Sequence, residues 1–456
     1  MSSDVRLIRS PISVAGMVLT TISAVVFLVV FLADLFGLHT NPYIGIVFFL
    51  LLPGLFVVGL ALIPFGAWIE RRRRAAGKTP SDVHWPRIDL NDPAQRTTAV
   101  IVFALTMANI VIVSLAATRG VEYMDSVQFC GQVCHTVMKP EFAAHAGQPH
   151  AHVKCVECHV GPGASSFAKA KLAGTRRVMG VTFGTYPRPI VASADRLLPA
   201  RDTCEQCHWP EQLHGDKIRR VVEYADDEKN TASTTTLRVH VGGGDGHLGT
   251  ATGIHWHMNV ANAIEYIATD ADRQVIPYVR MTDRQGAVRE YVADGVSADV
   301  VAKGVRHRMD CTDCHNRPSH AIDATPERAV NDAMSRGDLP TTLPFVHREA
   351  VKALKATYAT QDAAVSDIAR ALRDFYRAPP QSLSAASGPD LDRAVLAVQD
   401  VYRRDVFPEM KVTFGTYANN IGHIDAPGCF RCHDDSHKAK DGKKIGQDCE
   451  TCHAIE

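Results

Sequence analysis

The chain has 456 residues, and its 49 Lys and Arg balance its 49 Asp and Glu, so the formal net charge is zero. A nucleic-acid-binding protein is therefore not expected, because such proteins need a basic excess or a concentrated basic face to neutralise phosphates. Hydrophobic residues make up 46% of the chain and crowd into the first 120 residues, whereas all 12 cysteines and 19 of the 21 histidines follow residue 129. This uneven distribution excludes both a wholly soluble protein and a disordered one.

Three apolar runs predict three transmembrane helices, at about residues 10–36, 43–69 and 97–118. The second run is uncharged for 27 residues and the third for 22, and about 20 helical residues span a hydrocarbon core of roughly 30 Å. The proline and glycine residues of the second run are tolerated in membrane helices. A cleaved signal peptide is an alternative for the first run, but that run is too long and no small-x-small cleavage site follows it.

The basic residues around these runs predict the orientation of the chain. The connector at 37–42 has no Lys or Arg, whereas basic residues precede the first run and fill the loop at 70–96. By the positive-inside rule, the N-terminus and this loop are cytoplasmic. The third helix then leads outward, so we expect a bacterial inner-membrane protein with everything after Arg119 in the periplasm. The basic residues are Arg6, Arg9, Arg71, Arg72, Arg73, Arg74, Lys78, Arg87 and Arg96.

The cysteines form six pairs, and a histidine follows each pair directly. Cys-x-x-Cys-His is the attachment signature of c-type haem, in which two thiols bind the porphyrin and the adjacent imidazole is the proximal iron ligand. Zinc sites, redox-active pairs and disulfides do not need that histidine, so six covalently bound haem c groups are expected. The first motif has one extra residue between its cysteines, and Gly131 would let this longer loop fold back. In chain order, motifs one to six are Cys130, Cys134 and His135; Cys155, Cys158 and His159; Cys204, Cys207 and His208; Cys311, Cys314 and His315; Cys429, Cys432 and His433; and Cys449, Cys452 and His453.

Each low-spin iron needs a sixth ligand, and 13 histidines outside the motifs are candidates. His255 and His257 flank Trp256, and alternation along an extended segment would place both on one face. We expect one of the two, taken as His257, to be a ligand. Met138 is either a ligand of the first iron or an ordinary packing methionine, and both roles stay open. The remaining predicted ligands lie close to a motif, and they are His150, His214, His320, His423 and His437.

The motifs have no fixed spacing, which excludes a repeat array. Residues 1–120 form the predicted membrane domain, and 121–218 contain three motifs. Residues 219–305 predict a β-rich insert with a hairpin turn at 283–286. Residues 306–456 contain the other three motifs and a helical insert at 325–407, which begins with Thr325 as N-cap. The predicted fold class is mainly α with low regular content: three transmembrane helices and a periplasmic multihaem cytochrome c domain with a small β insert.

The stretch from Cys130 to Phe142, with Pro149-His150 and 155–162, resembles the NapC/NirT family of membrane-anchored quinol dehydrogenases. It is most similar to the larger inner-membrane multihaem cytochromes of metal-reducing bacteria. The resemblance covers the third helix through about Lys217, and this chain departs from the small members in its three helices, six motifs and longer first motif. The resemblance implies menaquinol oxidation at the haem closest to the membrane. It also implies a lysine beside the quinol, which by spacing is Lys171 or alternatively Lys169.

The position of the first motif agrees with this expectation, because it follows the third apolar run by only about a dozen residues. Its haem is therefore expected at the outer membrane surface, within reach of a lipid-soluble quinol. Electrons would then pass singly through the haems to a periplasmic cytochrome or reductase. Two alternatives remain open: a terminal multihaem reductase with an iron that lacks a distal ligand, and a cytochrome subunit of a larger respiratory complex without its own quinol site.

Overall fold

The computed structural model describes residues 10–35, 42–77, 91–133, 135–161, 164–190, 199–208, 215–242, 244–245, 250–251, 253–258, 263–378 and 388–456. The chain divides into two compact units, Met1–Met124 and Asp125–Glu456. The fold is mostly helical, with three candidate membrane helices and small sheets, as the sequence predicted. The finer division at residues 218 and 305 stays a prediction.

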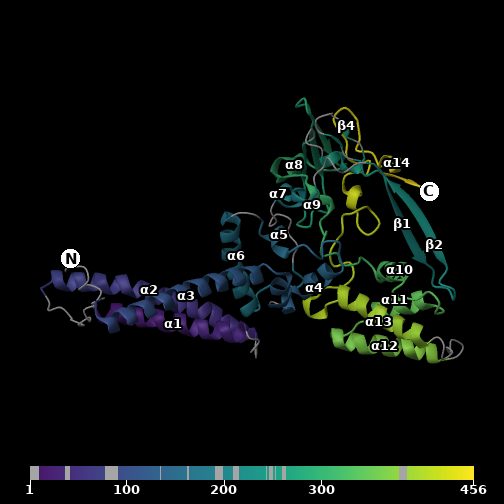
Figure 1. Ribbon diagram of the computed structural model, residues 1–456. Helices are drawn as coiled ribbons and strands as arrows, with labels where there is room; N and C mark the ends of the chain where they lie inside the picture. The colour runs from purple at the N-terminus through teal and green to yellow at the C-terminus, as the bar shows by residue number, and fades with distance from the viewer. Residues whose placement is uncertain are drawn as a thin grey trace. The chain divides into compact units, whose positions relative to one another are not determined.

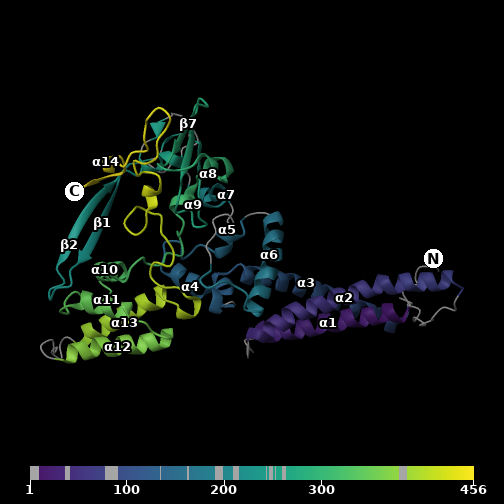
Figure 2. The ribbon, with the colours of Figure 1, turned by 180° about the vertical axis from the view of Figure 1, so that it is seen from behind.

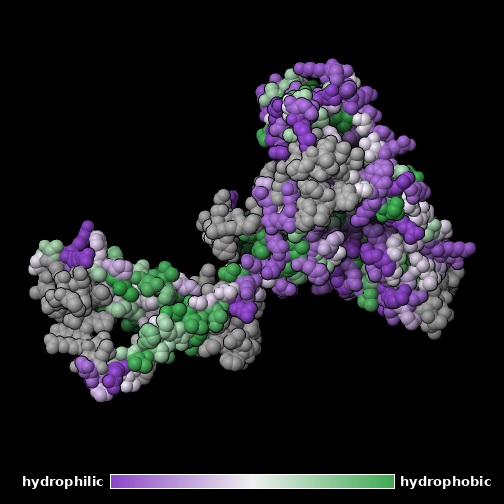
Figure 3. All heavy atoms as spheres, turned by 45° about the horizontal axis from the view of Figure 1, so that its top comes forward, coloured by the Kyte–Doolittle hydropathy of each residue, from purple (hydrophilic) through white to green (hydrophobic). Residues whose placement is uncertain are grey.

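Three long helices form the first unit, and they confirm the three predicted runs (Figure 1). Each contains a segment long and apolar enough to cross a membrane: Pro11–Val29, Leu52–Arg73 and Phe103–Met124. Hydrophobic side chains gather on the surface of these helices (Figure 3), where lipid would cover them. The helices are α1 (Pro11–Leu35), α2 (Pro42–Ala75) and α3 (Pro93–Met124).

Small residues let α1 and α2 approach each other closely. A Cβ atom added to Gly16 would lie 2.7 Å from the carbonyl oxygen of Gly59, and one added to Gly59 would lie 2.4 Å from the hydroxyl of Thr20. The hydroxyl of Ser13 donates a hydrogen bond of 2.9 Å to the carbonyl oxygen of Ile63. Close backbone packing and polar contacts of this kind are what hold helices together in lipid, where apolar burial gives little driving force.

The second unit contains antiparallel sheets joined by short helices (Figure 1). One sheet has the order β1-β2-β9, a second has the order β7-β6-β5-β8, and β3 pairs with β4. The strands are β1 (Lys217–Tyr224), β2 (Ala232–Val239), β3 (Gly244–Asp245), β4 (Thr250–Ala251), β5 (Ala263–Ile267), β6 (Tyr278–Thr282), β7 (Val288–Val292), β8 (Arg306–Arg308) and β9 (His453–Ile455), and α8 (Ala298–Lys303) precedes β8.

Local signals in the sequence explain two elements of this unit. The β6–β7 hairpin turns at Asp283, whose carboxylate accepts hydrogen bonds from the backbone N–H groups of Gln285 (3.0 Å) and Ala287 (2.8 Å). The side chain of Thr325 caps the first helix of the helical insert, and Pro326 is its first residue. The helices are α10 (Pro326–Arg336), α11 (Val346–Lys355), α12 (Gln361–Arg377) and α13 (Gly388–Asp405).

The β1–β2 hairpin connects the helical insert to the sixth motif (Figures 1 and 2). At one end, the amide of Asn230 donates hydrogen bonds to the carbonyl oxygens of Thr341 (3.2 Å) and Leu343 (2.8 Å). At the other end, β2 pairs with β9, where Val239 lies opposite His453. The core of the insert, which includes the fully buried Leu372, therefore supports the hairpin that positions the last motif histidine.

Candidate haem centres

Motifs two to six each lie on a single helical turn. On such a turn, residues three apart share one face, so both thiols of a Cys-x-x-Cys pair point to the same side. This arrangement fits the two thioether bonds of one porphyrin. The turns are α5 (Cys155–His159), η4 (Cys204–Gln206), α9 (Cys311–Cys314), η9 (Gly428–Arg431) and α14 (Cys449–Cys452).

The first motif begins in a π-helical turn, η2 (Phe129–Val133), and not in an α or 3-10 turn. A π turn is wider by one residue and so accommodates the extra residue between the cysteines. Gly131 is buried there, and a Cβ atom at this position would lie 2.1 Å from the ring of Phe142. Glycine is therefore needed for close packing against α4 (His135–Ala146). Cys134 and the side chain of His135 lie outside the described residues.

The other five motif histidines each face a second histidine from elsewhere in the chain. An imidazole nitrogen binds a first-row metal ion at about 2 Å, and the ring centre lies about 1 Å behind it, so two rings on opposite sides of one ion have centres about 6 Å apart. The observed separations match this spacing. They are 6.1 Å for His159 and His320, 5.9 Å for His208 and His150, 6.3 Å for His315 and His255, 5.8 Å for His433 and His257, and 6.1 Å for His453 and His423.

Hydrogen bonds fix the chemical form of most facing rings. A ring that donates Nδ1–H to a carbonyl oxygen keeps its lone pair on Nε2, the form that binds a metal. Burial, followed by the charge of Arg317, lowers the pKa of His320 to about 4, so this ring is neutral at ordinary pH. The Nδ1–carbonyl distances are 3.1 Å from His150 to Pro318, 3.0 Å from His255 to Val241, 2.8 Å from His257 to Ile254, and 3.1 Å from His320 to Glu141.

The prediction of a ligand at His437 disagrees with the structure. This ring is only 1% exposed, and its Nδ1 contacts the carboxylate of Asp434 and its Nε2 the carbonyl oxygen of Ile276, both at 2.8 Å. Both nitrogens are engaged by oxygen atoms of the protein, so neither is available to a metal. His437 therefore has a structural role, although it lies only four residues past the histidine of motif five.

The other four predicted site residues follow motifs one to three in the sequence. Met138 lies on α4, one turn beyond His135, and is half-buried. Lys169 and Lys171 lie on α6 (Ala164–Thr182), and their side chains fall outside the described residues. His214 also lies outside the described residues.

The prediction missed His255, which pairs with a motif histidine although only one of His255 and His257 was expected to do so. The spacing His-x-His was the available signal. The two rings belong to η6 (Ile254–Met258), a 3-10 turn and not an extended segment, so they diverge instead of sharing a face.

Neighbouring motifs adjoin one another in the order of the sequence. The side chain of Cys155 in motif two lies against Cys130 in motif one, and that of Cys204 in motif three lies against Cys311 in motif four. The other neighbouring motifs have cysteines close enough to interact electrostatically. These pairs are Cys158 with Cys204, Cys314 with Cys429, and Cys452 with Cys429.

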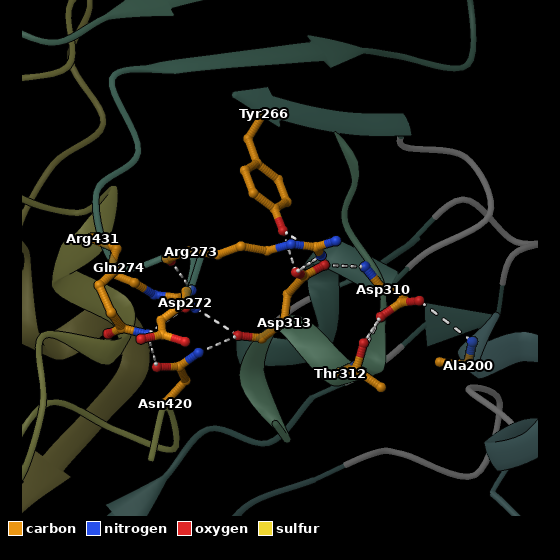
Figure 4. A network of polar contacts seen from close by, with 10 residues as sticks. All are labelled: Ala200, Tyr266, Asp272, Arg273, Gln274, Asp310, Thr312, Asp313, Asn420 and Arg431. Carbon is orange, nitrogen blue, oxygen red and sulfur yellow. Dashed lines mark hydrogen bonds and ion pairs between the residues drawn. The ribbon is translucent and has the colours of Figure 1, made fainter. Parts of the chain in front are cut away.

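A buried polar network fixes the fourth motif against the fifth (Figure 4). The guanidinium of Arg431, which lies between the cysteines of motif five, donates to the carbonyl oxygens of Asp313 (2.6 Å) and Arg273 (2.9 Å). The carboxylate of Asp313, inside motif four, accepts hydrogen bonds from the hydroxyl of Tyr266 and from Arg273 (3.1 Å). Polar side chains from a sheet and two motifs thus hold the two cysteine turns together.

The same network reaches the third motif through a helix cap (Figure 4). The carboxylate of Asp310 accepts from the backbone N–H of Thr312 (2.8 Å), and Asp313 accepts from the N–H of Asp310 (2.7 Å), which forms a capping box around α9. The second oxygen of Asp310 accepts from the N–H of Ala200 at 3.3 Å. Ala200 begins α7 (Ala200–Thr203), which leads directly into Cys204.

No family model and no solved structure matches the chain. The chain is 39% identical over 449 residues to the cytochrome c-type protein ImcH of Geobacter sulfurreducens, a match that covers 98% of this chain and 88% of the relative. The match therefore extends over both compact units of the chain. The chain therefore belongs to the same family as ImcH and is a membrane-linked, cytochrome c-type electron-transfer protein with covalently bound haem.

Proposed function

We propose that this protein is a hexahaem cytochrome c of the bacterial inner membrane that oxidises menaquinol at the haem nearest the membrane. It passes the electrons along its haem chain to a periplasmic cytochrome or reductase. The observation that carries this proposal is the pairing of five motif histidines with five other histidines at the spacing of a bis-imidazole iron centre. The sixth centre is that of the first motif, with His135 and Met138 as its candidate ligands.

The histidine pairs favour electron transfer over a terminal reductase. A reductase that binds a substrate on iron needs an open coordination position, whereas two imidazoles close both axial positions. The distal ligands on this proposal are His150, His255, His257, His320 and His423. Electrons would then hop between neighbouring closed centres, and the order of adjacent motifs supports a route from motif one to motif six.

The short link between the third helix and the first motif supports entry of electrons from quinol. Helix α3 ends at Met124, and Cys130 follows only six residues later. Menaquinol is lipid-soluble and releases two electrons and two protons, so its headgroup has to meet a haem near the membrane surface. With the N-terminus cytoplasmic, as the basic residues predict, the protons leave on the periplasmic side.

The resemblance to the NapC/NirT family implies a lysine beside the quinol, and the two candidates, Lys171 and Lys169, lie on α6. A nearby ammonium group stabilises the anion that forms when a quinol hydroxyl loses its proton. Removal of the ammonium should therefore slow electron entry while leaving the haems intact.

Stopped-flow reduction of the purified full chain in lipid nanodiscs tests this proposal, with menadiol as the electron donor. We expect Lys171→Ala to slow haem reduction by at least about tenfold, with unchanged haem spectra and unchanged reduction by dithionite. Lys303→Ala is the matched control, because Lys303 lies on α8 and pairs with the exposed Asp299 at 3.0 Å. A wild-type chain that dithionite reduces but menadiol does not would refute quinol oxidation and favour a subunit without its own quinol site.

A further inference from the structure

A single 3-10 turn directs three consecutive side chains to three different neighbours. In η6, the ring of His255 faces His315 of motif four and the ring of His257 faces His433 of motif five. Trp256, between them, packs against the buried cluster that contains Tyr266. A 3-10 helix has three residues per turn, so successive side chains point about 120° apart. This geometry explains why the two histidines reach separate motifs.

We propose that η6 is a two-iron clamp, in which His255 is the distal ligand of the haem of motif four and His257 that of motif five. The proposal rests on the haem binding of the proposed function and specifies it further. Because one residue separates the two ligands, the turn fixes the two adjacent haems relative to each other.

Backbone contacts hold the clamp in place at both of its ligands. The carbonyl oxygen of Val241 accepts from Nδ1 of His255, and that of Ile254 accepts from Nδ1 of His257, so both Nε2 atoms keep their lone pairs. The N–H of Ile254 donates to the carbonyl oxygen of His240 at 2.9 Å, just beyond the end of β2. Gly253 precedes the turn with a φ of +70°, and a Cβ atom there would lie 2.4 Å from the same oxygen.

The proximal sides of the same two haems are also connected. The hydrogen bond of 2.6 Å from Arg431 to the carbonyl oxygen of Asp313 joins the cysteine turns of motifs five and four. The two haems are therefore held from both sides, by the clamp on the distal side and by this network on the proximal side. Preorganised ligands of this kind allow little movement between centres when the oxidation state changes.

The two clamped centres differ in the angle between their imidazole planes, which is 4° for His255 and His315 but 83° for His257 and His433. Parallel planes interact with the same iron d orbital and separate two orbitals in energy, whereas crossed planes interact with one orbital each and leave the two nearly equal. Parallel ligands therefore give a rhombic low-spin EPR spectrum, and crossed ligands give a highly anisotropic one. We expect the haem of motif four in the first class and that of motif five in the second.

Low-temperature EPR of the oxidised, purified full chain tests the clamp. We expect His257→Met to remove one highly anisotropic signal and to leave the rhombic signal of motif four, and His255→Met to do the reverse. The control is His152→Met, since His152 has the same spacing from His150 but its exposed ring makes no ring contact with a motif histidine among the described residues. Its spectrum should match that of the wild type.

The proposal is overturned if both variants change the same signal, if either leaves the spectrum unchanged, or if the control changes it equally. If the variants fail to mature, which intact mass and a pyridine haemochrome assay would show, the wild-type spectrum is the second measurement. It must contain a rhombic signal and two highly anisotropic signals, those of motif three (78°) and motif five (83°), and detection of fewer than two highly anisotropic signals refutes the assignment. These readouts do not depend on quinol oxidation, so the clamp and the proposed function fail separately. The remaining angles are 78° for His150 and His208, 34° for His159 and His320, and 27° for His423 and His453.

Discussion

Arg431 makes three hydrogen bonds from a side chain that is almost fully buried, with the residue 8% exposed. Its guanidinium donates to the carbonyl oxygens of Gly428 (2.8 Å), Arg273 (2.9 Å) and Asp313 (2.6 Å). Arg431→Met keeps most of the length of the side chain but removes every donor. Three carbonyl oxygens then lose a charged partner in a place that water does not reach, so we predict that motif four will open locally.

The size of this effect follows from the burial and from the number of hydrogen bonds. A hydrogen bond to a charged group contributes roughly 1.5–3 kcal/mol, but three bonds from one side chain are not additive. A buried acceptor left without its donor costs about 1–3 kcal/mol, so for three partly coupled acceptors we expect the free energy of local opening to fall by roughly 3–4 kcal/mol. Since every 1.4 kcal/mol is a factor of ten, amide exchange in motif four should speed up by roughly 10²- to 10³-fold.

Hydrogen exchange of the full haem-loaded chain, followed by mass spectrometry, measures this directly in peptides that cover 310–316 and 428–433. Lys303→Met is the control, because the Lys303–Asp299 pair is exposed on both sides and should contribute about 0.5 kcal/mol or less. Unchanged exchange at 310–316 in Arg431→Met, or an equal acceleration in α12, would show that this guanidinium does not hold the two motifs together.

Three further variants test other parts of the second unit. Gly131→Ala brings a methyl group within 2.1 Å of the ring of Phe142, so intact mass should show one haem fewer than in the wild type, and a full complement would contradict the packing argument. Burial, followed by the neighbouring Asp405, raises the pKa of Asp323 to about 6 from its usual value of 3.8. Between these two values the folded chain holds a proton that the unfolded chain has lost. Stability should therefore fall as pH rises from about 4 to about 6. Asp323→Asn should flatten that part of a thermal-shift profile, and an unaltered slope would exclude this carboxyl as its source. His437→Gln should lower the melting temperature without changing any haem spectrum, whereas loss of one low-spin haem would restore the ligand prediction at this position.

Features set by neighbouring residues could be predicted from the sequence, because their causes are local. The three membrane helices follow from long uncharged runs, and the helical insert follows from the N-cap Thr325 and from apolar residues at helical spacing. The six haem motifs are likewise contiguous. A signal of this kind requires no knowledge of which distant segments meet.

The histidine pairs could not be assigned in the same way, because they depend on tertiary contacts. His320 lies five residues past the motif histidine His315, yet it faces His159 of motif two. His150 precedes motif two, yet it faces His208 of motif three. Chain proximity therefore identified useful histidines but not their partners, since adjacent motifs exchange ligands across the unit.

The hydrogen-bond partner of Nδ1 separates the two kinds of histidine more sharply than position in the sequence does. His150, His255, His257 and His320 donate Nδ1–H to backbone carbonyls, and each faces a motif histidine. His240, His347 and His437 instead place Nδ1 against a carboxylate, and none of them faces a motif ring among the described residues. Both kinds of acceptor take the Nδ1 proton and leave the lone pair of a neutral ring on Nε2, so the acceptor alone does not decide whether a ring can bind a metal. The surroundings of Nε2 decide it, and Nε2 of His437 already contacts the carbonyl oxygen of Ile276 at 2.8 Å. The set of ligands therefore depends on which Nε2 atoms the tertiary fold brings opposite a motif histidine.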